Sequence, residues 1–149
     1  MIFKLITAII LTSTLGFAGN LEGLWSFKTM TCKSGAAVSP FAYQFLKNSY
    51  ILYKQGTMTQ TIPISPDCIF SLTGPYSLNG DLLEMGLLKA AKSSTCPPGI
   101  SITDSSPKNA KIEIDTNTMT VSTLAGAVCT VANDVLVTSY FRSQLRRYK

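Results

Sequence analysis

The sequence has no histidine and little charge, and these two shortages narrow the classes of protein that it can be. Without histidine the chain lacks the commonest metal ligand and the commonest general base at neutral pH. Only 14% of its 149 residues are charged while 46% are hydrophobic, which excludes an intrinsically disordered chain. The body of the chain has no apolar run of eighteen or more residues, which excludes a multi-pass helical membrane protein. The length fits one domain.

The N-terminus has the pattern of a secretory signal. The positive residue Lys4 precedes an apolar stretch of roughly eleven residues, and the small residues Gly16 and Ala18 stand at −3 and −1 of a cut after Ala18. We therefore expect a signal peptide over residues 1–18 and a single, bacterial-type exported domain over residues 19–149. The mature form should be exported to the periplasm or the medium and should not span a membrane.

The four cysteines are expected to form two disulfides, because an exported chain folds in an oxidising compartment. They are widely separated, form no Cys-x-x-Cys pair and have no histidine to complete a zinc site, so no metal or cofactor is expected. Our first choice of pairing is Cys32–Cys68 with Cys96–Cys129, which ties each long loop to a nearby part of the molecule. The alternative is Cys32–Cys129 with Cys68–Cys96, since the first and last strands of a closed barrel are neighbours.

Hydrophobic residues alternate with a period of two along almost every segment, and no segment has a helical period. Asn79-Gly80 is a strong hairpin signal, because both residue types tolerate a positive φ. The sequence therefore predicts an all-β fold, an antiparallel up-and-down β-barrel of eight or nine strands. The expected strands cover 21–32, 41–53 (bent), 57–64, 68–78, 81–88, 111–115, 118–123, 128–132 and 135–142.

The connections between these strands are unequal in length. In an up-and-down barrel successive connections alternate between the two rims, so tight turns and long loops should separate. The tight turns near 55–56, 79–80, 116–117 and 133–134 would form one rim, and the connections 33–40, 65–67, 89–110 and 124–127 the other. Loops longer than about fifteen residues are uncommon and often functional. We therefore expect the loop-rich rim to be the mouth of a binding site.

Gly23-Leu24-Trp25, in the first strand after the signal peptide, resembles the Gly-x-Trp signature of lipocalins and lipocalin-like (calycin) barrels. In that family the last strand ends with an arginine that packs over the tryptophan, and Arg142 is the candidate match. The Thr-Asp-Tyr motif of the family is absent. The resemblance implies an eight-stranded barrel, closed where its first strand begins and open at the opposite rim.

The strand count and the arginine match conflict. With nine strands Arg142 would end at the loop-rich rim, far from Trp25, whereas with eight it would end beside it. Either 128–132 or 118–123 is then not a strand, or Arg142 does not correspond to the arginine of the family.

Function is expected to be binding rather than catalysis. A catalytic triad needs a general base beside its nucleophile, and the chain has no histidine to serve as one. A pair of carboxylates could serve glycoside hydrolysis, but the acidic residues fall mostly at turns or on polar faces. We therefore expect no enzyme and no catalytic residue. The leading hypothesis is a non-catalytic barrel that binds a small apolar or amphipathic ligand at its mouth, and the alternative is a protein-binding or inhibitor barrel that uses its disulfide-held rim loops on an extracytoplasmic protein. The candidate ligand-binding residues are the aromatic side chains Trp25, Phe27, Tyr43, Phe45, Phe70, Tyr76 and Phe141.

The C-terminal tail is basic. Arg142, Arg146, Arg147 and Lys149 lie within eight residues, beside aromatic side chains. Clustered cations with aromatics bind nucleic acids in other proteins, but four charges at a terminus more often form a solvated tail. We expect no nucleic-acid partner.

Overall fold

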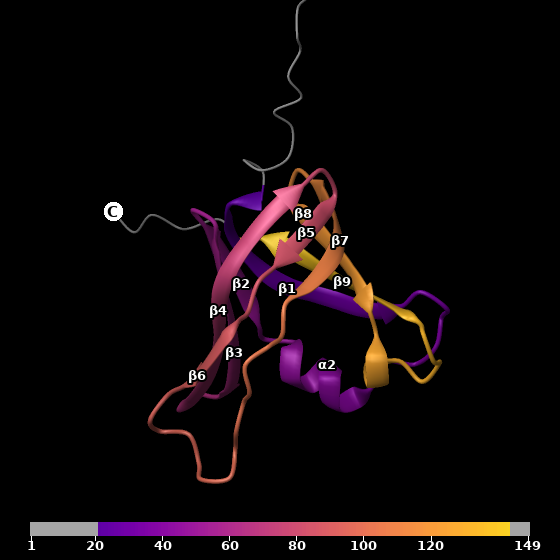
Figure 1. Cartoon of the computed structure of the whole chain (residues 1–149). Coiled ribbons are helices and arrows are strands. Elements are labelled where there is room, and N and C mark those ends of the chain that lie inside the picture. The colour runs from indigo at the N-terminus through magenta and orange to yellow at the C-terminus, as the bar shows by residue number, and fades with distance from the viewer. Residues whose placement is uncertain (1–20, 144–149) are drawn as a thin grey trace, which may run out of the picture.

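The protein is an antiparallel β-barrel in a computed structural model that describes residues 21–143 (Figure 1). The predicted signal peptide and all but Arg142 of the basic tail lie outside the described residues. Among the described residues no helix is long and apolar enough to cross a bilayer. The strands are β1 (Gly23–Cys32), β2 (Tyr50–Lys54), β3 (Thr57–Ser65), β4 (Cys68–Asn79), β5 (Leu82–Met85), β6 (Lys89–Lys92), β7 (Lys108–Asp115), β8 (Thr118–Leu124) and β9 (Val135–Arg142), and the helices are α2 (Pro40–Leu46) and the short 3-10 helix η1 (Gly126–Val128).

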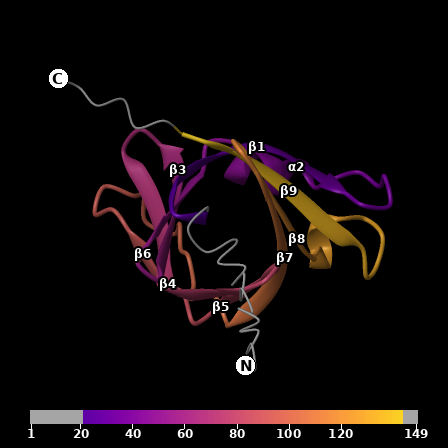
Figure 2. The same cartoon turned by 90° about the horizontal axis from the view of Figure 1, so that it is seen from above.

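The sheet closes on itself. Neighbouring strands pair antiparallel in chain order, β3 pairs with β4, and β1 pairs with β9, which gives the ring in Figure 2. The edge of β4 that faces away from β3 pairs first with β6 and then with β5, at Phe70–Thr73 and Tyr76–Asn79. Eight strands therefore encircle the barrel and β6 is an extra strand, so the predicted all-β barrel is confirmed.

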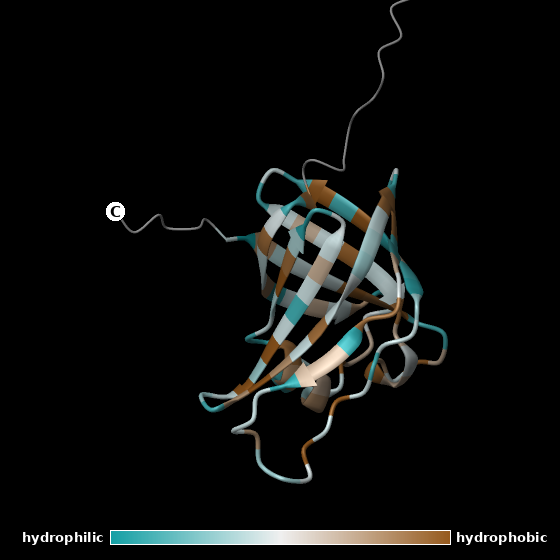
Figure 3. Ribbon diagram, turned by 60° about the vertical axis from the view of Figure 1, so that its left-hand side comes forward, coloured by the Kyte–Doolittle hydropathy of each residue, from teal (hydrophilic) through white to brown (hydrophobic). Residues whose placement is uncertain are grey.

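Hydrophobic and hydrophilic residues alternate along the strands of the barrel (Figure 3), and the burial of alternate residues places one face of each strand inside. On β7, for example, Ala110 and Ile112 are buried while Lys111 and Glu113 are exposed. Side chains of successive strand residues point to opposite faces, so a period of two builds a wall with an apolar inside and a polar outside. The closed end of the barrel is filled, since Leu21, Trp25 and Met119 are fully buried there.

The segment 41–53 is not one bent strand as predicted. Pro40–Leu46 is helix α2, and β2 begins only at Tyr50. Ser39 is the N-cap and its hydroxyl accepts a hydrogen bond from the Ala42 N–H, while proline occupies the first turn, where its missing N–H costs nothing. This Ser-Pro start signal outweighs the apparent alternation of the aromatic side chains.

The segment 128–132 is not a strand either. Val128 ends the 3-10 helix η1, whose Val128 N–H donates to the Ala125 carbonyl, and the chain then bends toward Asn133, which has a φ of 57°. The predicted turn at 133–134 therefore belongs to the long connection between β8 and β9, on the loop-rich rim. The other tight turns lie on the opposite rim as predicted.

Because 128–132 is not a strand, the conflict between the strand count and the position of Arg142 is resolved. The last strand now ends where β1 begins, and Arg142 stands opposite Trp25 in the register of the two strands. The Arg142 guanidinium lies 4.2 Å from the Trp25 ring, and its Nη1 donates a hydrogen bond of 2.8 Å to the Glu22 carbonyl. The Trp25 Nε1 donates to the Leu21 carbonyl at 2.8 Å. These contacts cap the closed end of the barrel.

All four cysteines are paired, and the pairing is Cys32–Cys129 with Cys68–Cys96. Our first choice of pairing was therefore wrong and the alternative is confirmed. The reason is topological: β1 and β4, which carry Cys32 and Cys68, have two strands between them. Each bridge instead joins neighbours in the wall, β1 to the segment before β9, and β4 to the loop that follows β6.

Candidate ligand-binding cavity

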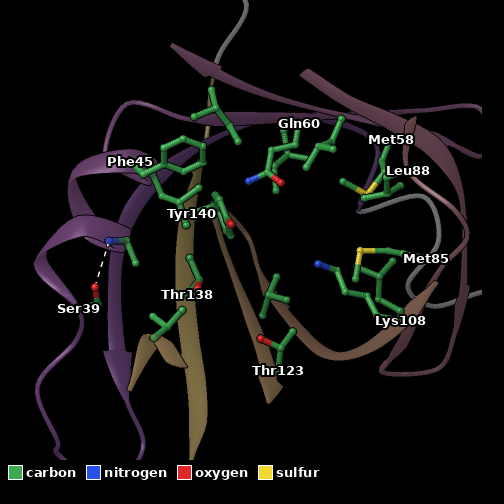
Figure 4. Close-up of a pocket in the computed structure, with 18 of the residues that line it drawn as sticks. Ser39, Phe45, Met58, Gln60, Met85, Leu88, Lys108, Thr123, Thr138 and Tyr140 are labelled. Carbon is green, nitrogen blue, oxygen red and sulfur yellow. Dashed lines mark hydrogen bonds between the residues drawn. The ribbon is translucent and has the colours of Figure 1, made fainter. Parts of the chain in front are cut away.

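The half of the barrel nearer the loop-rich rim is hollow. Its cavity has a volume of about 520 Å³ and opens beneath α2 (Figure 4). Seven of the eight strands of the ring or their ends, together with α2 and η1, contribute to its lining. The lining residues are Ser39, Phe41, Ala42, Phe45, Leu46, Ile51, Tyr53, Met58, Gln60, Ile62, Leu72, Leu83, Met85, Leu88, Lys108, Val121, Thr123, Ala127, Val128, Thr138 and Tyr140.

The deep wall of the cavity is apolar. Met58 on β3 and Leu83 on β5 are almost completely buried, and Met85 and Leu88 continue the same surface toward the rim. Aliphatic and thioether side chains of this kind fill space without fixed polar contacts, and methionine adapts its shape to different neighbours. This wall can therefore accommodate apolar parts of ligands that differ in shape.

Helix α2 and η1 border the mouth. The Ser39 N–H donates to the Val128 carbonyl at 2.8 Å and so joins the start of α2 to η1. From α2, Phe45 lies over the cavity, where its ring packs between those of Phe41 and Phe70, at 6.1 and 6.2 Å. No residue of α2 is fully buried, but Phe45 and Leu46 pack against the buried cluster of Ile62, Cys68 and Phe70, so the helix covers the mouth from the edge of the core.

A few polar groups enter the cavity between these apolar surfaces (Figure 4). Gln60 comes from β3, Thr123 from β8, Thr138 and Tyr140 from β9, and Lys108 from the first position of β7. Burial raises the pKa of the Tyr140 phenol well above its ordinary value, so the hydroxyl stays protonated and neutral. A largely apolar pocket with a few convergent polar groups is the usual form of a small-molecule site.

Of the aromatic residues that the sequence singled out, Phe45 lines the cavity. Phe70 is fully buried behind it, in a separate cluster with Ile62 and Cys68. Phe27 packs edge-on against Tyr43 and Tyr140 rather than facing the open space. These two side chains therefore pack behind residues that line the cavity.

The remaining predicted residues lie away from the cavity. Trp25 fills the closed end, and Tyr76 packs edge-on against Tyr53 at 5.0 Å. Phe141 is on the outer face, where Lys28 lies 4.7 Å from its ring. The prediction chose side chains by aromatic character, whereas the position of a strand residue along the barrel decides whether it meets the hollow half.

The sequence did contain the signal for the lining residues that were missed. Along 57–64 the alternation puts Met58, Gln60 and Ile62 on one face, and all three line the cavity. On β1 the alternation is broken by a bulge between Phe27 and Thr29, so the phase of that strand could not be read in the same way.

Cys32, Cys129 and Asp134 lie close together near the mouth, but they form a structural link between two segments rather than a metal site. The two sulfur atoms are bonded to each other. Hydrogen bonds from the hydroxyl of Ser34 and from the N–H groups of Val135 and Ser34 lower the pKa of Asp134 and hold its carboxylate. The disulfide and these hydrogen bonds fix the loop after β1 to the start of β9.

Chemically, the cavity offers a largely apolar space that is open at the mouth, several hydroxyl and amide groups and one ammonium group. The described residues that line it include no carboxylate and no cysteine. No family model, curated protein or solved structure matches the chain.

Proposed function

We propose that the protein is a non-catalytic, exported, lipocalin-like barrel that binds one small apolar or amphipathic molecule in this cavity. The observation that carries the proposal is the hollow half of the barrel. An eight-stranded barrel is just wide enough either to be filled by its own side chains or to hold one small ligand. Here large side chains fill the closed end, and a space of about 520 Å³ is left under α2.

The closed end supports the lipocalin-like part of the proposal. An eight-stranded meander that closes between its first and last strands is the architecture that the resemblance implies. The Gly23-x-Trp25 segment begins β1, and Arg142 from β9 lies over the tryptophan ring. These contacts involve residues far apart in the chain, so they support the resemblance independently of the three-residue motif.

The size and lining of the cavity support the nature of the ligand. Small-molecule sites commonly enclose about 300–1,000 Å³, and this cavity falls within that range. Its deep wall is apolar while its polar groups lie on several strands around it, which suits an amphipathic molecule.

Export is the second part of the proposal, and the two disulfides support it. Such bridges form and persist in oxidising compartments and are rare in the cytosol. The test is to express the whole sequence in cells and to measure the intact mass of the released protein. A chain that begins at residue 19 would support export, and the masses with and without reduction would give the number of disulfides.

Binding is tested with a neutral naphthylamine dye, whose fluorescence rises in an apolar site, and with a matched pair of variants. Val121 lines the cavity, whereas Val137 is on the outer face of the adjacent strand β9. We expect Val121→Phe to occupy the space and weaken dye binding about tenfold or more, and Val137→Phe to leave it unchanged.

Two outcomes would contradict the proposal. One is no dye binding to the wild-type protein together with no small molecule retained in native mass spectrometry. The other is an equal effect of the two phenylalanine substitutions, which would place the dye outside the barrel. Circular dichroism of each variant checks that the barrel is intact.

One observation favours the alternative, a barrel that binds a protein through its rim. Pro97, Pro98 and Gly99 are exposed in a loop that the Cys68–Cys96 bridge fixes to β4. A loop stiffened in this way loses little conformational entropy on docking. This contact would be insensitive to Val121→Phe and would be lost on substitution of the two prolines.

A further inference from the structure

We propose that the bound molecule is an anionic amphiphile whose acidic head group pairs with Lys108, while its apolar tail lies against the deep wall of the cavity. This inference rests on the proposed function and adds the charge and the orientation of the ligand. The head group is defined by its chemistry, as a carboxylate or sulfonate on an apolar chain.

The backbone fixes Lys108 on the inner row of β7. It is the first residue of the strand and stands opposite Met85 of β5 in the register. Ala110 and Ile112, two and four residues further on, are both buried inside the barrel. Because strand side chains alternate, Lys108 belongs to the same inward row. Figure 4 shows its ammonium group pointing into the cavity beside Met85.

Other lysines nearby have acidic partners, and Lys108 differs from them. Lys89 lies 2.8 Å from Asp104, and Lys111 lies 3.6 Å from Asp81 and 3.8 Å from Glu113. Within residues 21–143 no ion pair or hydrogen bond of the Lys108 side chain is found, and the cavity lining there contains no Asp or Glu. The cavity therefore holds a positive charge that the surrounding side chains do not neutralise.

An unpaired ammonium group beside an apolar wall favours an anionic ligand over a neutral one. Lys108 is exposed at the mouth, so water screens its charge, but an acidic head group held beside it by an apolar tail would gain an ion pair that a neutral head group cannot form. Two hydroxyl groups also line the cavity, that of Thr123 near the mouth end of β8 and that of Thr138 deeper on β9. Hydroxyl donors in the same cavity are suited to the several acceptor positions of a carboxylate or sulfonate.

The same arrangement sets the orientation. Lys108 and Thr123 are near the open ends of their strands, whereas Met58 and Tyr53 lie toward the tight-turn rim. An apolar tail that enters past α2 reaches the deep wall while its head group stays at the mouth. The opposite orientation would bury the charge against methionine and leucine side chains.

The test compares ligands of equal length that differ in their head group. Dodecanoate and dodecanol are used to displace the neutral dye from the wild-type protein, from Lys108→Gln and from Lys111→Gln, which removes an outward-facing lysine of the same strand. We expect dodecanoate to bind the wild-type protein more tightly than dodecanol. Lys108→Gln should weaken dodecanoate about threefold, as expected of an ion pair that water still reaches, without affecting dodecanol. Lys111→Gln should change neither.

A charge-reversal variant distinguishes the loss of a specific ion pair from general damage to the fold. Lys108→Glu should reject dodecanoate and bind dodecylammonium more tightly than the wild-type protein does, a gain that a damaged barrel would not produce. Equal binding of dodecanoate and dodecanol by the wild-type protein, or no effect of Lys108→Gln, would overturn the inference while the dye still binds. Failure of the dye to bind any of the proteins would instead overturn the proposed function.

Discussion

At the scale of the residue, the contact between Arg142 and Trp25 reinforces the seam where β1 and β9 close the barrel. The guanidinium lies over the ring and also donates to the Glu22 carbonyl, so one side chain fixes the beginning of β1 to the end of β9. We expect Arg142→Ala to lower the free energy of unfolding by about 2 kcal/mol, because a cation–π contact is stronger where it is shielded from water and the arginine stem also packs. Urea denaturation followed by fluorescence of Trp25, the single tryptophan, measures this loss.

Lys28 provides the matched control for this prediction. Its ammonium lies 4.7 Å from the ring of Phe141, but both side chains are exposed. Lys28→Ala should therefore cost only about 0.5 kcal/mol. Equal losses for Lys28→Ala and Arg142→Ala would show that the shielding of Trp25 contributes nothing.

At the scale of the element, Gly74 allows β4 to change partners from β6 to β5. A Cβ atom at this position would lie 2.3 Å from the Leu87 carbonyl oxygen and 2.9 Å from a methyl carbon of Leu88, so the backbone of the connection between β5 and β6 would have to move. We expect Gly74→Ala to lower the free energy of unfolding by about 2 kcal/mol or more. Because Leu88 lines the cavity, the same variant should also weaken dye binding.

Gly80 offers a comparison in which only backbone strain changes. Its φ is +63° in the turn before β5, and a Cβ there would meet open space. We expect Gly80→Ala to cost about 1 kcal/mol, the strain of an alanine in the left-handed region, with no change in dye binding. A smaller loss for Gly74→Ala than for Gly80→Ala in urea denaturation would show that the connection between β5 and β6 moves freely away from Gly74.

The elements also show what the sequence could and could not predict. Strands such as 57–64 and 111–115 were predictable because alternation alone determines which face is buried. Helix α2 was missed because aromatic residues in 41–53 imitate alternation, although Ser39-Pro40 carries a start signal for a helix. The cavity was not predictable, because a hollow depends on the summed volumes of side chains from many strands at one height. A single bulge, as on β1, changes that sum.

At the scale of the whole molecule, the two disulfides differ in how much of the chain they constrain. Cys32–Cys129 spans 97 residues and Cys68–Cys96 spans 28. In the chain-entropy description these bridges stabilise by about 4.7 and about 3.6 kcal/mol, because a longer closed loop removes more freedom from the unfolded chain. The long bridge also lies beside the mouth, since Val38 forms a β-bridge with Cys129 just before α2 begins.

We therefore expect the double variant Cys32→Ser/Cys129→Ser to lose about 1 kcal/mol more free energy of unfolding than Cys68→Ser/Cys96→Ser. The first variant should also weaken dye binding, because the connection between Val38 and η1 positions the helix that covers the cavity. Urea denaturation of each variant in its oxidised form measures the first effect, and a dye titration the second. If Cys68→Ser/Cys96→Ser loses more free energy of unfolding than Cys32→Ser/Cys129→Ser, the bridges do not stabilise the protein mainly by restricting the unfolded chain. Unchanged dye binding in Cys32→Ser/Cys129→Ser would show that α2 holds its place over the mouth without the bridge.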